Sequence, residues 1–360
     1  AIITNVFTEP KERAQAIGVW GGVIGISLAL GPIVGGALVD SIGWRSIFWI
    51  NVPVGVTALI LTILFVPESR AEHARRIDPV GQVLILIFLF TLTYAIIEGP
   101  GRGWGSNLIM ALFAVSAVSA AALVAYELRR PEPLIDPRFF ASLPFSAATV
   151  IAVCAFGALA GFLFMNTLYL QNVRGFTPLH AGLTTVPIAV MALIFAPISG
   201  RIVGRQGTRL PLLIAGLGIT ASGLMLTRLT NTTPLWWLLI TYVVFGIGFA
   251  MVNAPITNTA VSGMPRAQAG VAAAIASTSR QVGSTLGVAI IGSAVVTGIN
   301  GQFRMSFAEA SHIGWWIVAG SGVIVLTLGF ISSGSRAAAS AEAVRERLRG
   351  PQAPEPTTVT

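Results

Sequence analysis

One charged residue lies well inside an apolar stretch of this sequence. Arg280, followed by Gln281, belongs to the mostly apolar residues 268–298. A charged side chain in a membrane helix is costly, by about 2.5–3.5 kcal/mol on insertion scales for arginine, and marks a functional site by default. At helical spacing Arg280 shares a face with small residues, namely Ala276, Gly283 and Gly287. We therefore expect Arg280 to face protein, either as a functional charge or as a structural arginine that binds backbone carbonyls or reaches the cytoplasmic interface.

Aromatic and amide side chains recur at helical spacing in two other apolar stretches, 145–170 and 234–254. Aromatic faces with a few amides suit large lipophilic or cationic molecules. The residues at this spacing are Phe162, Asn166 and Tyr169 in the first stretch and Tyr242, Phe245, Phe249 and Asn253 in the second. Ordinary aromatic packing remains the alternative for each of these residues.

Small residues and one proline dominate the stretch 15–38. The notable positions are Gly18, Ser27, Gly31, Pro32, Gly35 and Gly36. Ser27, Gly31 and Gly35 are four residues apart and form one smooth helical face, which another helix can approach closely. Pro32 removes one backbone hydrogen bond and kinks the helix. This stretch is either a packing seam or a bend that seals or moves a transport path.

A basic, glycine-rich segment links two further apolar stretches. It reads GRIVGRQGTR and contains Gly200, Arg205, Gly207 and Arg209. Two interpretations stay open: a cytoplasmic turn with the usual excess of positive charge, or a latch that binds helix ends in one conformational state.

Residues for enzymatic or metal chemistry are not grouped in this sequence. His73, His180 and His312 are far apart, and Cys154 is the single cysteine. No nucleophile–base pair or phosphate-binding loop is recognisable, so we expect no enzyme activity, no cofactor and no metal site. None of the apolar stretches carries a carboxylate near its centre, since Asp40 and Glu98 fall at stretch ends.

The elements that carry these residues are apolar stretches long enough to cross a membrane. Of the 360 residues 54% are hydrophobic and 10% are charged, against about 25% charged residues in soluble domains. This composition excludes a soluble enzyme, a disordered chain and a disulfide scaffold. About 20 apolar residues make a membrane helix, and strands would show a period of two. The sequence predicts ten helical spans: 15–38, 46–66, 79–98, 107–127, 145–170, 180–203, 210–229, 234–254, 268–298 and 313–333.

The distribution of basic residues predicts the orientation of these spans. Sixteen of the 22 Lys and Arg residues lie in one set of alternate loops and five in the other, with Arg280 inside a span. The richer side is expected to be cytoplasmic, together with the C-terminus. The net charge of +8 is therefore explained by topology, and no nucleic-acid partner is expected.

Three motifs resemble those of one transporter family. Gly18 to Gly36 is similar to the antiporter motif in the fifth helix of the major facilitator superfamily, with Ser27 at a position where the family has glycine. WRSIFWINVPVG, starting at Trp44, resembles the opening of the sixth helix in its fourteen-helix drug:proton antiporter branch, the EmrB/QacA type. GRIVGRQGTR resembles the superfamily's basic loop signature, although Gly204 replaces the usual acidic residue.

The resemblance implies an all-α, polytopic membrane protein with the major facilitator fold, lacking helices one to three and most of helix four. Residues 1–66 would be the remainder of the N-terminal six-helix half, which implies an N-terminally truncated chain. Basic connectors with an inserted helix pair (79–98 and 107–127) would occupy 67–144. The C-terminal six-helix half would be 145–333, followed by a cytoplasmic, largely disordered tail at 334–360 in which SAEAVRERLRG forms one short helix.

The implied function is proton-coupled efflux of lipophilic or cationic drugs by alternating access, across a bacterial cytoplasmic membrane. The expected partners are a drug-like small molecule, protons and the lipid bilayer, with a monomer favoured. In the family the proton-carrying acid lies in the first helix. The superfamily's ninth and twelfth helices line its central cavity, so the resemblance makes the aromatic and amide residues of 145–170 and 234–254 the candidate substrate cavity. Two alternatives stay open: an exporter of a specific endogenous metabolite or antibiotic on the same fold, and a polytopic membrane enzyme.

Overall fold

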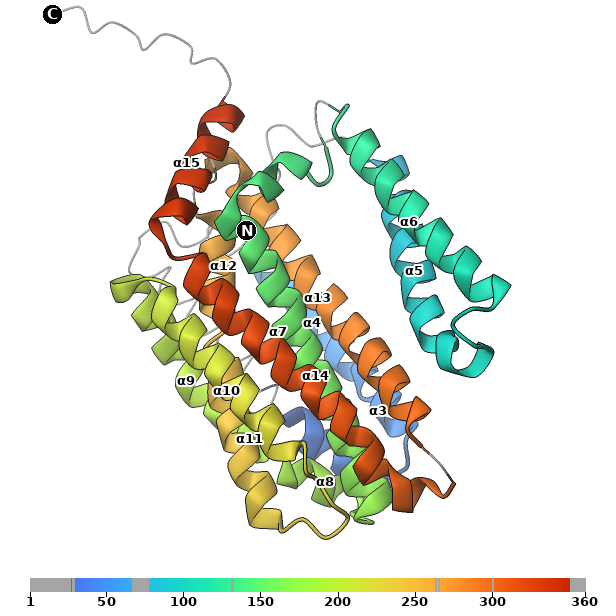
Figure 1. Cartoon of the computed structure of the whole chain (residues 1–360). Coiled ribbons are helices and arrows are strands. Elements are labelled where there is room, and N and C mark those ends of the chain that lie inside the picture. Colours follow the sequence, from blue (N-terminus) through green and yellow to red (C-terminus); the bar gives the residue numbers. More distant parts are fainter. Residues whose placement is uncertain are drawn as a thin grey trace, which may run out of the picture.

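The computed structural model describes residues 27, 30–66, 78–130, 133–262, 264, 266–299 and 301–349, and these are helices joined by turns (Figure 1). Gly18, most of the predicted span 15–38 and much of the first connector lie outside the described residues. The helices before the bundle are Leu30–Ser41, α3 (Ser46–Trp49), α4 (Asn51–Phe65), α5 (Pro79–Arg102) and α6 (Asn107–Glu127).

The later helices form the bundle and the tail. They are the 3₁₀ turn η1 (Pro137–Ala141), α7 (Leu143–Leu168), the π-helical turn η2 (Tyr169–Val173), α8 (Pro178–Thr184), α9 (Val186–Gln206), α10 (Arg209–Leu226), α11 (Leu235–Ala250), α12 (Asn253–Val261), α13 (Arg266–Thr297), α14 (Phe303–Ile331) and α15 (Ser335–Arg349).

Eight helices in the described part of the chain are long and apolar enough to cross a membrane. They coincide with eight of the ten predicted spans. The predicted span 268–298 is α13, whose 32 residues make a helix about 48 Å long at 1.5 Å per residue; its polar side chains keep it out of the eight. The described part of 15–38 begins the shorter apolar helix Leu30–Ser41. The protein is therefore an all-helical, multi-pass membrane protein.

The core of the bundle is built on α7. This helix packs along α13 and α14, while α10 packs on α14 and α11 packs on α9 and α10 (Figure 1). Glycines bring the backbones of α7 and α13 into contact: a Cβ added to Gly283 would lie 2.5 Å from the carbonyl oxygen of Val153, and one added to Gly287 would collide with the backbone of Gly157. Only glycine fits there.

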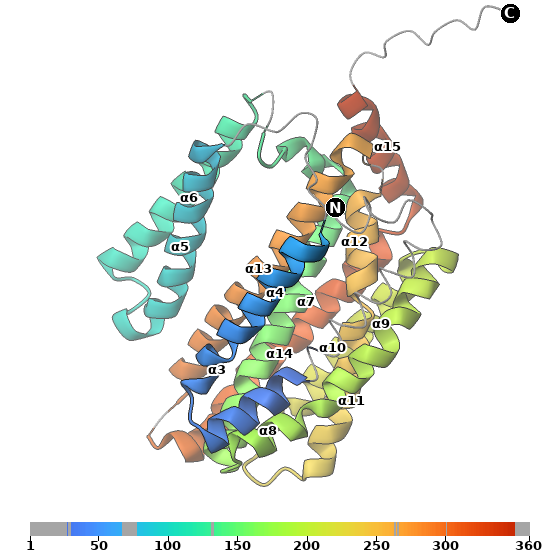
Figure 2. The same ribbon diagram turned by 180° about the vertical axis from the view of Figure 1, so that it is seen from behind.

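The α5–α6 pair stands beside the bundle. The two helices pack on each other, and α5 also packs on α13, where the hydroxyl of Ser293 donates a 2.7 Å hydrogen bond to the carbonyl of Ile96. Both views show the pair as a separate unit at the α13 side (Figures 1 and 2). That this pair is an insertion between two six-helix halves stays a prediction.

The described part of the C-terminal tail is helical rather than disordered. The expectation of a largely disordered segment at 334–360 is corrected for Ser335–Arg349, which form α15. Ala337, Ala341 and Val344 are buried on one face of this helix, which packs on α7 and η1. The hydroxyl of Ser340 accepts a 3.0 Å hydrogen bond from the backbone N–H of Leu143. Burial of an apolar face thus orders this segment.

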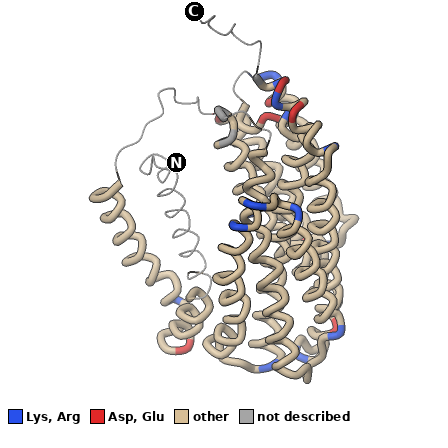
Figure 3. The backbone as a smooth tube through the Cα atoms, turned by 90° about the vertical axis from the view of Figure 1, so that its left-hand side faces the viewer, with Lys and Arg blue, Asp and Glu red and all other residues tan. Residues whose placement is uncertain are grey.

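Charged residues occupy few places in the structure. Most of the tube in Figure 3 is tan, and the blue and red positions are gathered in small groups. One group belongs to α15, where Arg345 and Glu342 lie 3.6 Å apart. Long tan segments between such groups are what a lipid-facing bundle requires.

Candidate functional site

The helix formed by α11 and α12 is interrupted at Met251 and Val252. The interruption follows from Pro255, which has no N–H to donate to the carbonyl of Met251, four residues earlier. The buried hydroxyl of Ser199, on α9, donates a 3.1 Å hydrogen bond to that same carbonyl. A neighbouring helix therefore replaces the hydrogen bond that the proline removes.

Arg280 on α13 contacts the other side of this break. One guanidinium nitrogen donates to the hydroxyl of Thr257, at 2.6 Å, and to the carbonyl of Asn253, at 3.5 Å. The guanidinium also lies 5.8 Å from the ring centroid of Phe156 on α7. Arg280 thus faces protein as expected, and it binds a backbone carbonyl as its structural interpretation requires. Discontinuous helices form the substrate and ion sites of many transporters, and a functional role of the Arg280 charge stays a prediction.

Gln281 points to a different neighbour. It lines a pocket of about 470 Å³ between α13 and α5, together with Phe90, Tyr94, Thr278 and Thr285. The rings of Phe90 and Tyr94 are stacked there, with centroids 6.0 Å apart. Although Arg280 and Gln281 are adjacent in sequence, the structure does not bring their side chains to one site.

The aromatic and amide residues predicted to line a cavity are packed in the core instead. Phe162 stacks on Phe245 with ring centroids 4.2 Å apart, and the hydroxyl of Tyr242 donates to the side-chain oxygen of Asn166. Six of the seven residues are buried, namely Phe162, Asn166, Tyr169, Tyr242, Phe245 and Phe249. Asn253 is the exposed one. The structure places these six in the packed core among α7, α11 and α14, and their role in a substrate cavity stays a prediction.

The glycine–proline helix, Leu30–Ser41, contacts α8 through its backbone. A Cβ added to Gly36 would lie 2.6 Å from the carbonyl oxygen of Pro178, and one added to Gly182 would collide with the carbonyl of Pro32. Figure 2 shows this helix, in dark blue, next to α8. Gly31 and Gly35 have no described atom within 4 Å of an added Cβ. The close contact therefore uses the Pro32–Gly36 face rather than the predicted Ser27–Gly31–Gly35 face.

Asp40 strengthens this contact, a role that the sequence analysis did not predict. Its carboxylate accepts a 3.0 Å hydrogen bond from the backbone N–H of Leu179, in the first turn of α8. An acidic group at a helix N-terminus is stabilising because the first N–H groups have no partner inside the helix. Asp40 lies four residues after Gly36, so helical spacing could have placed both on one face. Nothing in the sequence, however, indicates that Asp40 pairs with Leu179, 139 residues away.

The basic loop motif forms the turn between α9 and α10. Gly207 ends α9 with a φ of +83°, a conformation that favours glycine. The guanidinium of Arg209 lies 4.4 Å from the ring centroid of Phe330 on α14. Within the described residues, Gly200 has nothing near an added Cβ, and Arg205 and Arg209 form no ion pair. The motif thus forms a turn with basic side chains, and the choice between a cytoplasmic turn and a latch stays a prediction.

Sequence comparison decides the family. Residues 1–288 match the Major Facilitator Superfamily. The chain belongs to this superfamily. Its members are transporters, so the protein is a membrane transporter homologue rather than an enzyme.

The relatives are bacterial resistance and efflux proteins. The multidrug resistance protein Stp of Mycobacterium tuberculosis is 38% identical over 310 residues, which are 86% of this chain and 58% of Stp. The tetracenomycin C resistance and export protein of Streptomyces glaucescens is 36% identical over 316 residues, covering 86% and 58%. The multidrug efflux pump LfrA of Mycolicibacterium smegmatis is 32% identical over 296 residues, covering 81% and 58%. The chain spans just under three fifths of the length of these relatives.

Proposed function

We propose that this chain forms the larger part of a proton-coupled efflux antiporter that exports lipophilic or cationic drugs across a bacterial cytoplasmic membrane. The observation that carries the proposal is the backbone contact between the glycine–proline helix and α8. Pro32 and Gly36 lie on one side of it and Pro178 and Gly182 on the other. This contact joins the segment before the inserted pair to the C-terminal bundle. In alternating access these two parts move against each other.

The chemistry of this contact suits a joint between moving parts. It has little interdigitating side-chain volume, because glycines and prolines supply most of the surface. The hydrogen bond from Leu179 to Asp40 is exposed, so water can replace it when the parts separate. A contact of this kind can open without leaving a cavity in the core, which favours a role in switching over a purely structural one.

A second substrate class is supported by one relative. The Streptomyces glaucescens protein is described as a resistance and export protein for tetracenomycin C, and Stp as a multidrug resistance protein. We therefore keep export of one specific antibiotic as the alternative to broad drug export. The two differ in the number of unrelated compounds whose efflux the protein supports.

Transport assays distinguish these alternatives. The native gene product, purified and reconstituted in proteoliposomes with an imposed proton gradient, should couple inward proton flux to uptake or release of several lipophilic cations. A specific exporter would respond to one compound of a panel that includes a polyketide antibiotic. A rate of substrate transport that is unchanged when the proton gradient is collapsed would contradict proton coupling.

A further inference from the structure

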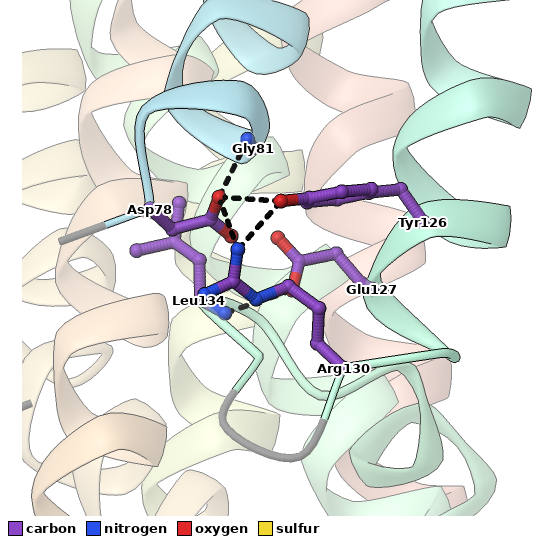
Figure 4. A network of polar contacts seen from close by, with 6 residues as sticks. All are labelled: Asp78, Gly81, Tyr126, Glu127, Arg130 and Leu134. Atoms are coloured by element: carbon purple, nitrogen blue, oxygen red, sulfur yellow. Dashed lines mark hydrogen bonds and ion pairs between the residues drawn. The ribbon is translucent and has the colours of Figure 1, made fainter. Parts of the chain in front are cut away.

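A buried polar network joins the start of α5 to the end of α6. One carboxylate oxygen of Asp78, Oδ1, accepts hydrogen bonds from the backbone N–H of Gly81 at 3.0 Å and from the hydroxyl of Tyr126 and the guanidinium of Arg130, both at 3.2 Å. Glu127 accepts a 2.8 Å hydrogen bond from the backbone N–H of Leu134 through Oε2. Figure 4 shows both carboxyl groups at the same place, between α5, α6 and the following segment.

The two carboxyl groups each keep one oxygen without a hydrogen-bond partner. These atoms are Oδ2 of Asp78 and Oε1 of Glu127, in side chains of residues that are 3% and 2% exposed. Both oxygens point to the space above Gly81. A Cβ added to that glycine would lie 2.7 Å from Oδ2 of Asp78 and 2.6 Å from Oε1 of Glu127. Two carboxylate oxygens that border one small space without a donor repel each other unless a proton is bound there.

We propose that Asp78 and Glu127 form a proton-binding site, in which one proton is shared between Oδ2 of Asp78 and Oε1 of Glu127. With that proton the network of Asp78, Glu127 and Arg130 is neutral. Without it one buried negative charge has no counterpart, which is unfavourable in a low-dielectric setting. The same proton supplies the missing donor for both unpartnered oxygens.

Hydrogen bonding assigns the proton to Glu127. Asp78 accepts three hydrogen bonds, one of them from a charged donor. Glu127 accepts hydrogen bonds from the backbone N–H groups of Leu134 and Ile135 alone, and neither donor is charged. Glu127 is therefore the carboxylic acid, and its O–H donates to Asp78.

The remaining charges around the pair leave this balance unchanged. Arg130 lies 3.2 Å from Asp78, and Arg138 is paired with Asp136 at 2.8 Å, while Arg129 is exposed. Together with Glu127 and Leu128 these groups, Arg129, Arg130, Asp136 and Arg138, line a pocket of about 390 Å³. That pocket gives the Glu127 carboxyl a path to water, so the proton can exchange with solvent.

Loss of the proton should loosen this end of the inserted pair. Two adjacent carboxylates would repel, and the segment that Leu134 anchors to Glu127 would lose its fixed position. The site does not depend on the proposed transport activity, because it is defined by the folded structure. It can therefore be tested on the purified chain without a substrate.

Infrared spectroscopy of the purified protein during a pH titration tests the proposal. We expect a protonated-carboxyl C=O band at neutral pH that shifts with ¹³C-glutamate labelling and stays in place with ¹³C-aspartate labelling. Glu127→Gln should remove this band, while its amide still donates to Asp78 and accepts from Leu134. The matched control is Glu98→Gln, at the other end of α5, where the exposed carboxylate pairs with Arg102 at 2.7 Å; it should keep the band.

Thermal unfolding gives a second readout. The unfolding temperature of the wild type should fall as pH rises through the apparent pKa of the pair, whereas Glu127→Gln should not show this step. The proposal is wrong if the wild type has no protonated carboxyl at neutral pH or if the band survives in Glu127→Gln. A band that shifts with aspartate labelling alone would overturn the assignment to Glu127, even if the variant fails to fold.

Discussion

At the scale of single residues, the break between α11 and α12 depends on two side chains from other helices. Ser199 donates a hydrogen bond to the carbonyl of Met251, and Arg280 donates to Thr257 and Asn253. Backbone groups inside a membrane bundle cannot form replacement hydrogen bonds with water. These two side chains therefore hold the backbone conformation of the break.

Ser199→Ala should destabilise the protein because the buried carbonyl of Met251 would lose its donor. We expect about 1 kcal/mol, which is within the range for hydrogen bonds between membrane helices. In a Pro255→Ala background, the N–H of residue 255 can bond to the carbonyl of Met251. Ser199→Ala should therefore reduce the free energy of unfolding by less in that background. Thermal unfolding of the two single variants and the double variant measures this coupling. Equal cost in both backgrounds would show that Ser199 does not replace the missing hydrogen bond.

Arg280→Ala should impair transport more than Arg280→Lys, since lysine keeps the charge without the planar fork of donors. Thr257→Val removes the acceptor at 2.6 Å and should cause part of the same loss. If Arg280 acts through Thr257, the double variant will be no worse than Arg280→Ala. Substrate-dependent proton flux in proteoliposomes is the measurement, and a normal flux for Arg280→Ala would leave it a structural residue.

At the scale of elements, the contact between the glycine–proline helix and α8 leads to a matched comparison. Gly36→Leu or Gly182→Leu would force a side chain into backbone atoms, and overpacking of this kind costs about 1–3 kcal/mol. We expect less folded protein and lost export. Gly320→Leu is the control, because Gly320 is exposed on α14 with nothing within 4 Å of an added Cβ. Full export by Gly36→Leu would show that this contact is dispensable.

Most elements could be predicted from the sequence, but most contacts could not. A run of about 20 apolar residues is sufficient to indicate a membrane helix, and α5 and α6 appear at their predicted places. Helical spacing, however, predicted one small-residue face with Ser27, Gly31 and Gly35, whereas the contact with α8 uses Pro32 and Gly36. The aromatic pattern around Phe162 is the same for a core and for a cavity. Asp78 and Glu127 meet only because α5 and α6 are antiparallel.

At the scale of the whole molecule, the distribution of basic residues predicts which helix ends face the cytoplasm. Gly105 and Gln302 lie at one end of their helices, while Arg129 and α15 lie at the other. With Cys154 replaced, cysteines at positions 105 and 302 should react with an impermeant maleimide added outside cells. A cysteine at position 129 should react only after lysis. Strong external labelling at position 129 would reverse the proposed orientation, including the cytoplasmic C-terminus.

The contact between α7 and α13 restricts where this molecule can flex. Gly157 and Gly287 place two main chains against each other with no side chain between them, so neither helix can slide or rotate by small rotamer changes. The two helices should move as one rigid body. We expect bending in a neighbour whose own hydrogen bonding is already interrupted, which is the case for the break between α11 and α12, beside Ser199 and Arg280.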